Sequence, residues 1–255
     1  MSHKDANHQA PEPLGLSNYK DFADRYGRIA EDKPHNAYYN IPAVLSLLPD
    51  RLDGLSVLDA GCGPGFLAAD LSGRGARVTA FDVTPAMVEM TRNRLGPESQ
   101  VLLANLEEPL EFAGDASFDF IVCPLVLSYV EDWDAVFAEF YRVLRPGGSI
   151  VVSTEHPHGE YEWLKRKHGK NPRYFATERH TVEWRGFGDP PPQIRFYRRS
   201  LASMINPMLD AGLILDHVLE PLPTQEFRAR DQKGYYALMD MPVFILFRAK
   251  KPRAS

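Results

Sequence analysis

The chain has 255 residues, 44% of them hydrophobic and 25% charged, which is typical of a globular domain and excludes a largely disordered chain. Its net charge of −5 excludes a global basic field for nucleic acid, and its two cysteines exclude a disulfide framework. Residues 1–18 lack the apolar segment of a signal peptide, and the most apolar stretch, 118–130, is too short to span a membrane. We therefore predict a soluble cytoplasmic protein with no membrane span and no nucleic-acid partner. The sequence does not indicate an oligomeric state.

The predicted elements, taken in chain order, describe one α/β domain. Residues 1–17 are expected to form a flexible tail, and residues 18–255 form the domain. Helices come first, over about 19–30 and 38–48. Strands follow at 56–59, 77–82, 101–104, 118–122 and 149–153, together with helices at 66–72, 85–95 and 133–144. This alternation is typical of a doubly wound, Rossmann-like parallel sheet with helices on both faces.

Residues 156–199 interrupt the alternation. They contain aromatic and charged residues and a run of prolines at 190–192, but no clear period. We interpret this segment as an insertion after the fifth strand that covers the substrate. A helix at 201–211 and two strands, at 213–219 and 242–247, complete a sheet of seven mostly parallel strands.

A glycine-rich loop, Ala-Gly-Cys-Gly-Pro-Gly at 60–65, follows the first predicted strand. Glycines are required where the backbone turns sharply and a ligand approaches closely. Asp82 ends the next strand, where an acid can accept both hydroxyls of a ribose. A dinucleotide loop would place a small residue where Phe66 stands, and Asp59 would repel a pyrophosphate. Asp59 instead suits a ligand with an ammonium and a sulfonium group, as in S-adenosylmethionine (SAM).

The glycine loop and Asp82 are followed by Ala-Asn-Leu at 104–106, Phe-Asp-Phe-Ile-Val-Cys at 118–123 and Arg-Val-Leu-Arg-Pro-Gly-Gly at 142–148. Because these motifs occur in this order, the chain resembles the class I SAM-dependent methyltransferases over about 38–156. It most resembles the small-molecule branch that includes ubiquinone and menaquinone methyltransferases. The resemblance implies SAM as cofactor and transfer of its methyl group to a small-molecule acceptor by in-line displacement, mainly through proximity and orientation.

The resemblance also implies a role for each cofactor-binding position. Asp59 would orient the ammonium, Gly61, Cys62 and Gly63 would cradle the methionine end, Asp82 would hold the ribose, Val83, Asn105 and Leu106 would surround the adenine, and Cys123 would line the floor near the sulfonium. We further predict Tyr26 and Tyr38 as lid residues that approach the sulfonium through cation–π attraction. No Cys/His set has zinc spacing, so no metal is predicted.

A general base is needed only when the nucleophile is protonated. Glu155, His156 and His158 follow the fifth predicted strand, and we predict His156 as the base because the pKa of histidine lies near neutrality. In the alternative interpretation, His156 and the proline after it form a structural turn. The seven Lys and Arg residues within 163–185 favour an acceptor of anionic character, and an aromatic acceptor is equally compatible.

Three other functions stay open. A nucleic-acid or protein methyltransferase is opposed by the net charge and by Cys-Pro-Leu-Val at 123–126, which lacks the Pro-Pro-aromatic clamp of amino-methylating DNA enzymes. A protein of this fold could also bind SAM without transferring its methyl group. A nicotinamide oxidoreductase is opposed by Phe66 and Asp59.

Overall fold

The computed structural model describes residues 12–253, so residues 1–11 of the predicted tail lie outside the described residues. Ordered structure begins earlier than predicted, because helix α1 (Leu14–Tyr19) falls within the expected tail. The single helix predicted over 19–30 is also wrong. The chain leaves the helical conformation at Phe22, where φ is −139°, and α2 (Ala23–Ile29) starts anew. This break allows the Tyr19 ring to pack on both Phe22 and Tyr26, at centroid distances of 5.2 and 5.1 Å.

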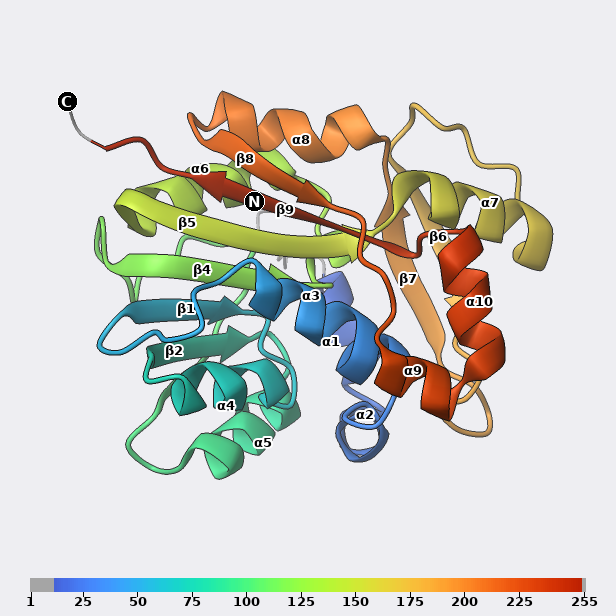
Figure 1. Cartoon of the computed structure of the whole chain (residues 1–255), viewed down its shortest axis with the longest axis horizontal. Helices are drawn as coiled ribbons and strands as arrows, with labels where there is room; N and C mark the ends of the chain where they lie inside the picture. Colours follow the sequence, from blue (N-terminus) through green and yellow to red (C-terminus); the bar gives the residue numbers. More distant parts are fainter. Residues whose placement is uncertain (1–11, 254–255) are drawn as a thin grey trace, which may run out of the picture.

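A seven-stranded sheet in the order β3-β2-β1-β4-β5-β9-β8 forms the centre of the protein (Figure 1). Its strands are β1 (Ser56–Ala60), β2 (Arg77–Asp82), β3 (Gln100–Leu103), β4 (Phe118–Pro124), β5 (Leu144–Glu155), β8 (Ile214–Leu219) and β9 (Phe244–Lys250). Strands β1 to β5 pair in parallel, and β9 runs antiparallel to both β5 and β8. The predicted doubly wound, mostly parallel sheet is confirmed.

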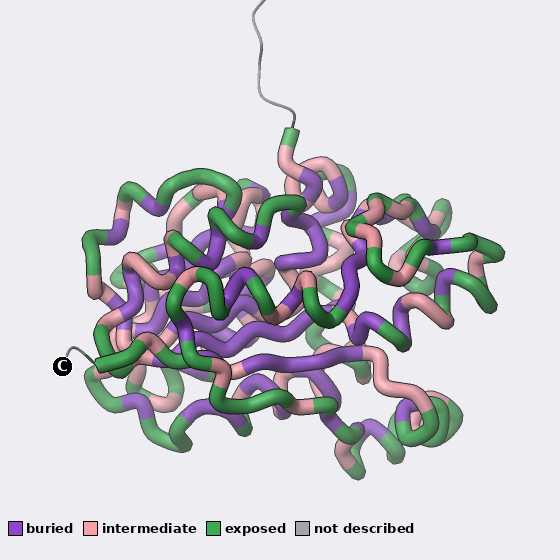
Figure 2. The backbone as a smooth tube through the Cα atoms, turned by 90° about the horizontal axis from the view of Figure 1, so that it is seen from above, coloured by how far each residue is buried: buried purple, intermediate pink, exposed green. Residues whose placement is uncertain are grey.

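Helices cover both faces of this sheet. One face packs against α6 (Trp133–Val143) and α8 (Leu201–Asp210), and the other against α3 (Ile41–Ser46), α4 (Phe66–Gly73) and α5 (Pro85–Leu95). Successive residues of β1 alternate between the two cores, because Val57 joins the α3–α4 side and Leu58 the α6–α8 side. Figure 2 shows the strands as the buried centre of the fold. No helix within 12–253 is long and apolar enough to cross a membrane.

The segment 156–199 is regular, although its sequence shows no clear period. It contains α7 (Pro157–His168) and an antiparallel pair, β6 (Glu178–Glu183) and β7 (Gln193–Arg198), that forms a separate small sheet. Two further helices, α9 (Gln225–Arg230) and α10 (Gln232–Asp240), are not predicted from the sequence. These elements gather beyond the carboxyl ends of the parallel strands, at the right of Figure 1.

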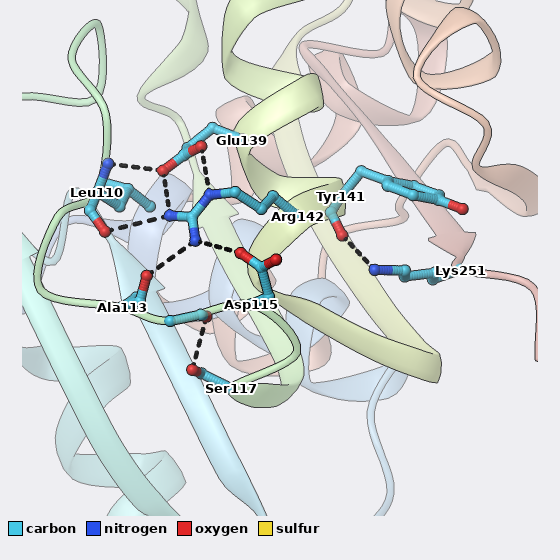
Figure 3. A network of polar contacts seen from close by, with 9 residues as sticks. Leu110, Ala113, Asp115, Ser117, Glu139, Tyr141, Arg142 and Lys251 are labelled. Carbon is cyan, nitrogen blue, oxygen red and sulfur yellow. Dashed lines mark hydrogen bonds and ion pairs between the residues drawn. The ribbon is translucent and has the colours of Figure 1, made fainter.

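Arg142 attaches α6 to the loop between β3 and β4 (Figure 3). Its guanidinium donates hydrogen bonds to Glu139 and Asp115, both at 2.8 Å, and to the carbonyl oxygens of Ala113 at 3.0 Å and Leu110 at 3.3 Å. The Glu139 carboxylate also accepts the N–H of Leu110 at 2.7 Å. This network holds in place the β3–β4 loop, which also contains residues 105 and 106.

We expect Arg142→Ala to lower the free energy of unfolding by about 2 kcal/mol, because several charge-assisted hydrogen bonds are lost from a partly shielded site. Urea unfolding measures the change. Arg51→Ala is the matched control, since Arg51 pairs with Asp53 and both side chains are exposed. The control is expected to change stability by less than about 0.5 kcal/mol. Equal effects of the two substitutions would contradict the structural role of Arg142.

Candidate functional site

A cavity of about 1450 Å³ lies at the carboxyl ends of the parallel strands. Ligands of doubly wound sheets bind at this edge, outside the ends of the strands. The cavity is lined by the glycine loop, by the N-terminal helices, by α7 and the β6–β7 pair, and by α10. Typical ligand pockets measure roughly 300–1000 Å³, so this cavity has room for two small molecules side by side.

The glycine loop leaves β1 through two residues with left-handed backbone, Gly61 with φ +76° and Gly63 with φ +53°. A Cβ at position 61 would lie 2.4 Å from a methyl group of Val126, so the fold itself requires this glycine. A Cβ at position 63 would meet no atom within 4 Å. Gly63 therefore leaves open space beside the backbone of a loop that lines the cavity.

Asp82 connects the end of β2 to this loop. Its carboxylate accepts the N–H of Gly63 at 3.0 Å and the N–H of Thr84 at 2.8 Å. Burial raises the pKa of Asp82, and these hydrogen bonds oppose that increase. Each carboxylate oxygen has a second lone pair available for a ligand hydroxyl.

Asp59, at the end of β1, is fully buried, and neither of its carboxylate oxygens has a hydrogen-bond partner within the described part of the chain. Burial, and in addition the charge of Asp82, raises the pKa of Asp59 to about 7. An unpaired buried carboxylate is unfavourable unless a cation compensates it. Because Asp59 lines the cavity, its surroundings fit a ligand that carries an amino group, as SAM does.

Most residues predicted to bind the cofactor line this cavity. They are Tyr26, Asp59, Gly61, Cys62, Gly63, Asp82, Val83, Asn105 and Leu106. Tyr38 and Cys123 do not line it, and we do not retain them as cofactor-binding residues. Tyr38 packs against an apolar cluster that includes Tyr39 and Phe227, and Cys123 is fully buried in the core between the sheet and α6.

His156 has a structural position. Its Nδ1 accepts the N–H groups of His158 at 3.3 Å and Gly159 at 3.2 Å, which caps the start of α7. Its Nε2 lies 2.7 Å from a carboxylate oxygen of Glu220, so both ring nitrogens are engaged. His156 is buried outside the cavity lining, and we correct the prediction that it is a base. The alternative interpretation, a structural turn, describes the observed contacts.

Five cavity-lining residues form what we call the aromatic–acidic cluster: Tyr19, Tyr129, Glu155, Glu160 and Trp184. The hydroxyl groups of Tyr19 and Tyr129 are 2.9 Å apart, and the Tyr19 and Trp184 ring centroids are 6.3 Å apart. Burial, and then the charge of Glu155, raises the pKa values of Tyr129 and Glu160. The cluster therefore groups two carboxyls and three aromatic rings in one part of the cavity.

Tyr26 connects this cluster to the cofactor-binding residues. Its ring packs on Tyr19, and its pKa is raised by burial and also by the charge of Asp82. Tyr26 stacks on Phe187 of the β6–β7 loop at a centroid distance of 5.6 Å. Lys33 donates a hydrogen bond to the carbonyl of Gly186 at 2.8 Å. These contacts join α2 and the β6–β7 loop into one roof over the cavity.

The sequence of this chain is similar to those of known methyltransferases over part of its length. Residues 58–152 match the profile of a methyltransferase domain. A malonyl-[acyl-carrier protein] O-methyltransferase from Serratia marcescens is 42% identical over 102 residues, 40% of this chain and 38% of the relative. A ubiquinone biosynthesis O-methyltransferase from Xanthomonas oryzae pv. oryzae is 37% identical over 154 residues, 56% of this chain and 64% of the relative. The chain thus spans less than two thirds of the length of these two relatives.

A solved structure extends the similarity beyond this region. The SAM-dependent methyltransferase from Mesorhizobium loti is 28% identical, with a TM-score of 0.68, over 82% of this chain and 96% of that one. Residues 58–152 thus match a methyltransferase domain, and the chain shares the fold of this SAM-dependent methyltransferase.

Proposed function

We propose that this protein transfers a methyl group from SAM to a small-molecule acceptor. The observation that carries the proposal is Asp59, a buried carboxylate that has no hydrogen-bond partner among residues 12–253 and lines the cavity beside the glycine loop. When bound, SAM supplies a methyl group on a positively charged sulfur that a nucleophile readily displaces. Asp59 would hold the amino group and Asp82 the ribose hydroxyls. Val83 and the segment 105–106 would flank the adenine.

The chain itself contributes mainly position and a proton acceptor. Alignment of the nucleophile can account for much of the rate enhancement of a displacement reaction. Glu155 replaces His156 as the candidate base, because its carboxyl lines the cavity and burial raises its pKa. A raised pKa brings a carboxylate closer to the operating pH and makes it a better proton acceptor. The roof over the cavity would exclude water from the reacting atoms.

The acceptor we propose is a small molecule with an aromatic or apolar body. The two curated relatives are named for malonyl-[acyl-carrier protein] and ubiquinone biosynthesis, which are different acceptor chemistries. The basic residues of the insertion give little support to an anionic acceptor. Arg166 pairs with Glu162 at 2.6 Å and Arg173 with Glu178 at 2.8 Å. We also propose a reducing, cytoplasmic location, supported by two free and buried cysteines.

Calorimetric titration of SAM and S-adenosylhomocysteine tests the cofactor directly. We expect the wild type to bind both and Asp82→Ala to bind them at least roughly 30-fold more weakly, because about 2 kcal/mol of charged hydrogen bonding is lost. Asp50→Ala, at an exposed position outside the cavity, is the control and is expected to bind normally. Equal binding by the wild type and Asp82→Ala would contradict the assigned site. Binding of NADH in place of SAM would favour the oxidoreductase alternative.

A further inference from the structure

Glu160 is a buried charged residue in the wall of the cavity. It lies in the first turn of α7, is only 6% exposed and lines the cavity. Within residues 12–253, its carboxyl forms no ion pair and no hydrogen bond, and its backbone N–H donates to the carbonyl of His156. A carboxyl that is buried and unpartnered in this way is unfavourable in the protein alone. Its position indicates that its partner is a ligand.

Glu155 adds a second carboxyl to the same part of the cavity. The hydroxyl of Thr154 lies 3.2 Å from the Glu155 carboxylate. The charge of Glu155 raises the pKa of Glu160 after the larger effect of burial, so the two carboxyls interact electrostatically. Two carboxyls that line one shielded cavity create a negative potential that a bound cation would relieve.

The buried arginines nearby do not supply that cation. The Arg198 guanidinium donates to backbone carbonyls within 173–176, and the Arg199 guanidinium donates to backbone carbonyls within 127–131. Neither residue lines the cavity, and neither forms an ion pair with Glu160. Their longer-range attraction only partly offsets the increase in the pKa of Glu160 that burial and the charge of Glu155 cause. The basic side chains of the insertion that line the cavity, those of Arg166, Lys167, Lys170 and Arg185, are all exposed to solvent.

The aromatic rings of the same cluster also suit a cationic ligand. Tyr19, Tyr129 and Trp184 line the same cavity as the two carboxyls, and Tyr19 contacts the other two. Aromatic faces attract ammonium groups and also pack on apolar bodies. We infer that the acceptor is an amine, a cationic nitrogen on an aromatic or apolar body, held by Glu155 and Glu160. This inference rests on the proposed methyl transfer and replaces the anionic acceptor expected from the sequence.

The chemistry balances with these residues. A primary or secondary amine arrives as its ammonium form, and the Glu155 carboxylate accepts one proton from the nitrogen. The freed lone pair forms the new N–C bond while the C–S bond breaks, and the electron pair of that bond stays on sulfur. The product carries the positive charge on the methylated nitrogen, where Glu160 compensates it. The Glu155 proton then passes to solvent when the roof opens.

Matched ligand series test this inference. Calorimetry in saturating S-adenosylhomocysteine would compare 2-phenylethylamine with 2-phenylethanol and 3-phenylpropanoate, and tryptamine with indole-3-propanoate. We expect each amine to bind at least tenfold more tightly than its carboxylate partner. Glu160→Gln is expected to lose about tenfold in amine affinity, equivalent to about 1.4 kcal/mol, while its affinity for S-adenosylhomocysteine stays unchanged.

Glu178→Gln is the matched control, because Glu178 belongs to the same insertion but lies outside the cavity lining. Its amine affinity is expected to equal that of the wild type. If no amine binds more tightly than its carboxylate partner, or if Glu160→Gln leaves amine affinity unchanged, the amine assignment is wrong and the proposed methyl transfer stands. Failure of the wild type to bind S-adenosylhomocysteine would overturn the proposed function and this inference together.

Discussion

Asp59→Asn is expected to stabilise the protein without its cofactor and to remove SAM binding. The pKa of Asp59 is raised from 3.8 to about 7, so the folded state favours the protonated carboxyl. The stability that protonation provides is fully present below about pH 4 and is lost as the pH rises through 7. At pH 8 the ionised carboxylate therefore destabilises the fold, by on the order of 4 kcal/mol for a shift of this size.

Urea unfolding at pH 8 is expected to show a gain of about 1–3 kcal/mol for Asp59→Asn, smaller than the full electrostatic effect because the amide is also buried without partners. The gain should largely disappear at pH 5, where the wild-type carboxyl is protonated. SAM affinity at pH 8 is expected to fall at least roughly 100-fold, because the ammonium loses its counter-ion. A variant that is less stable than the wild type at both pH values would show that Asp59 is a structural residue.

Gly63→Ala is expected to fold and yet to lose SAM binding. The left-handed backbone at position 63 costs an alanine about 1–2 kcal/mol, and its Cβ would meet no protein atom within 4 Å. The added methyl group would instead occupy the open space beside a loop that lines the cavity. We expect SAM affinity to fall at least roughly tenfold in calorimetry, with a cooperative unfolding transition retained.

Substitutions at two other glycines distinguish a loss of stability from a direct obstruction of SAM. At Gly61 a Cβ would lie 2.4 Å from Val126, so Gly61→Ala is expected to lose more stability than Gly63→Ala. At Gly73, near the end of α4, a Cβ also meets nothing within 4 Å, but this residue lies outside the cavity lining. Gly73→Ala is expected to leave SAM affinity unchanged. Normal SAM binding by Gly63→Ala would mean that the cofactor does not approach this part of the loop.

The fold was predictable where local signals and burial agree. The predicted bounds of β2 and α5 coincide with those observed, because both elements lie in the repeating strand–helix part of the chain. The insertion has weaker periodicity, since α7 buries only part of one face around Leu164. Its cap at His156 and the proline that follows are nevertheless local helix-start signals. The short helices α9 and α10 likewise begin at caps, Thr224 and Asp231.

The site also contains residues that the sequence indicates and residues that only the fold brings together. The residues proposed to bind the cofactor lie in a short motif and near the ends of the following strands, so sequence motifs and the family resemblance indicated most of them. The aromatic–acidic cluster depends on contacts between distant segments, such as the pair Tyr19 and Tyr129, which are 110 residues apart. The base that we propose, Glu155, is the chain neighbour of the base predicted from the sequence, His156. Which of two adjacent residues, Glu155 or His156, turns into the cavity depends on strand orientation and helix capping.

The roof has a consequence for how acceptor preference can change in this protein. Its two halves, α2 and the β6–β7 loop, lie far apart in the chain and touch through Tyr26, Phe187 and Lys33. A chimera that receives only residues 156–199 from a relative would present a foreign loop to the original α2. Exchange of both segments together would preserve their mutual fit and leave the glycine loop untouched. We therefore expect that a change of acceptor preference requires the exchange of both segments in the same chimera.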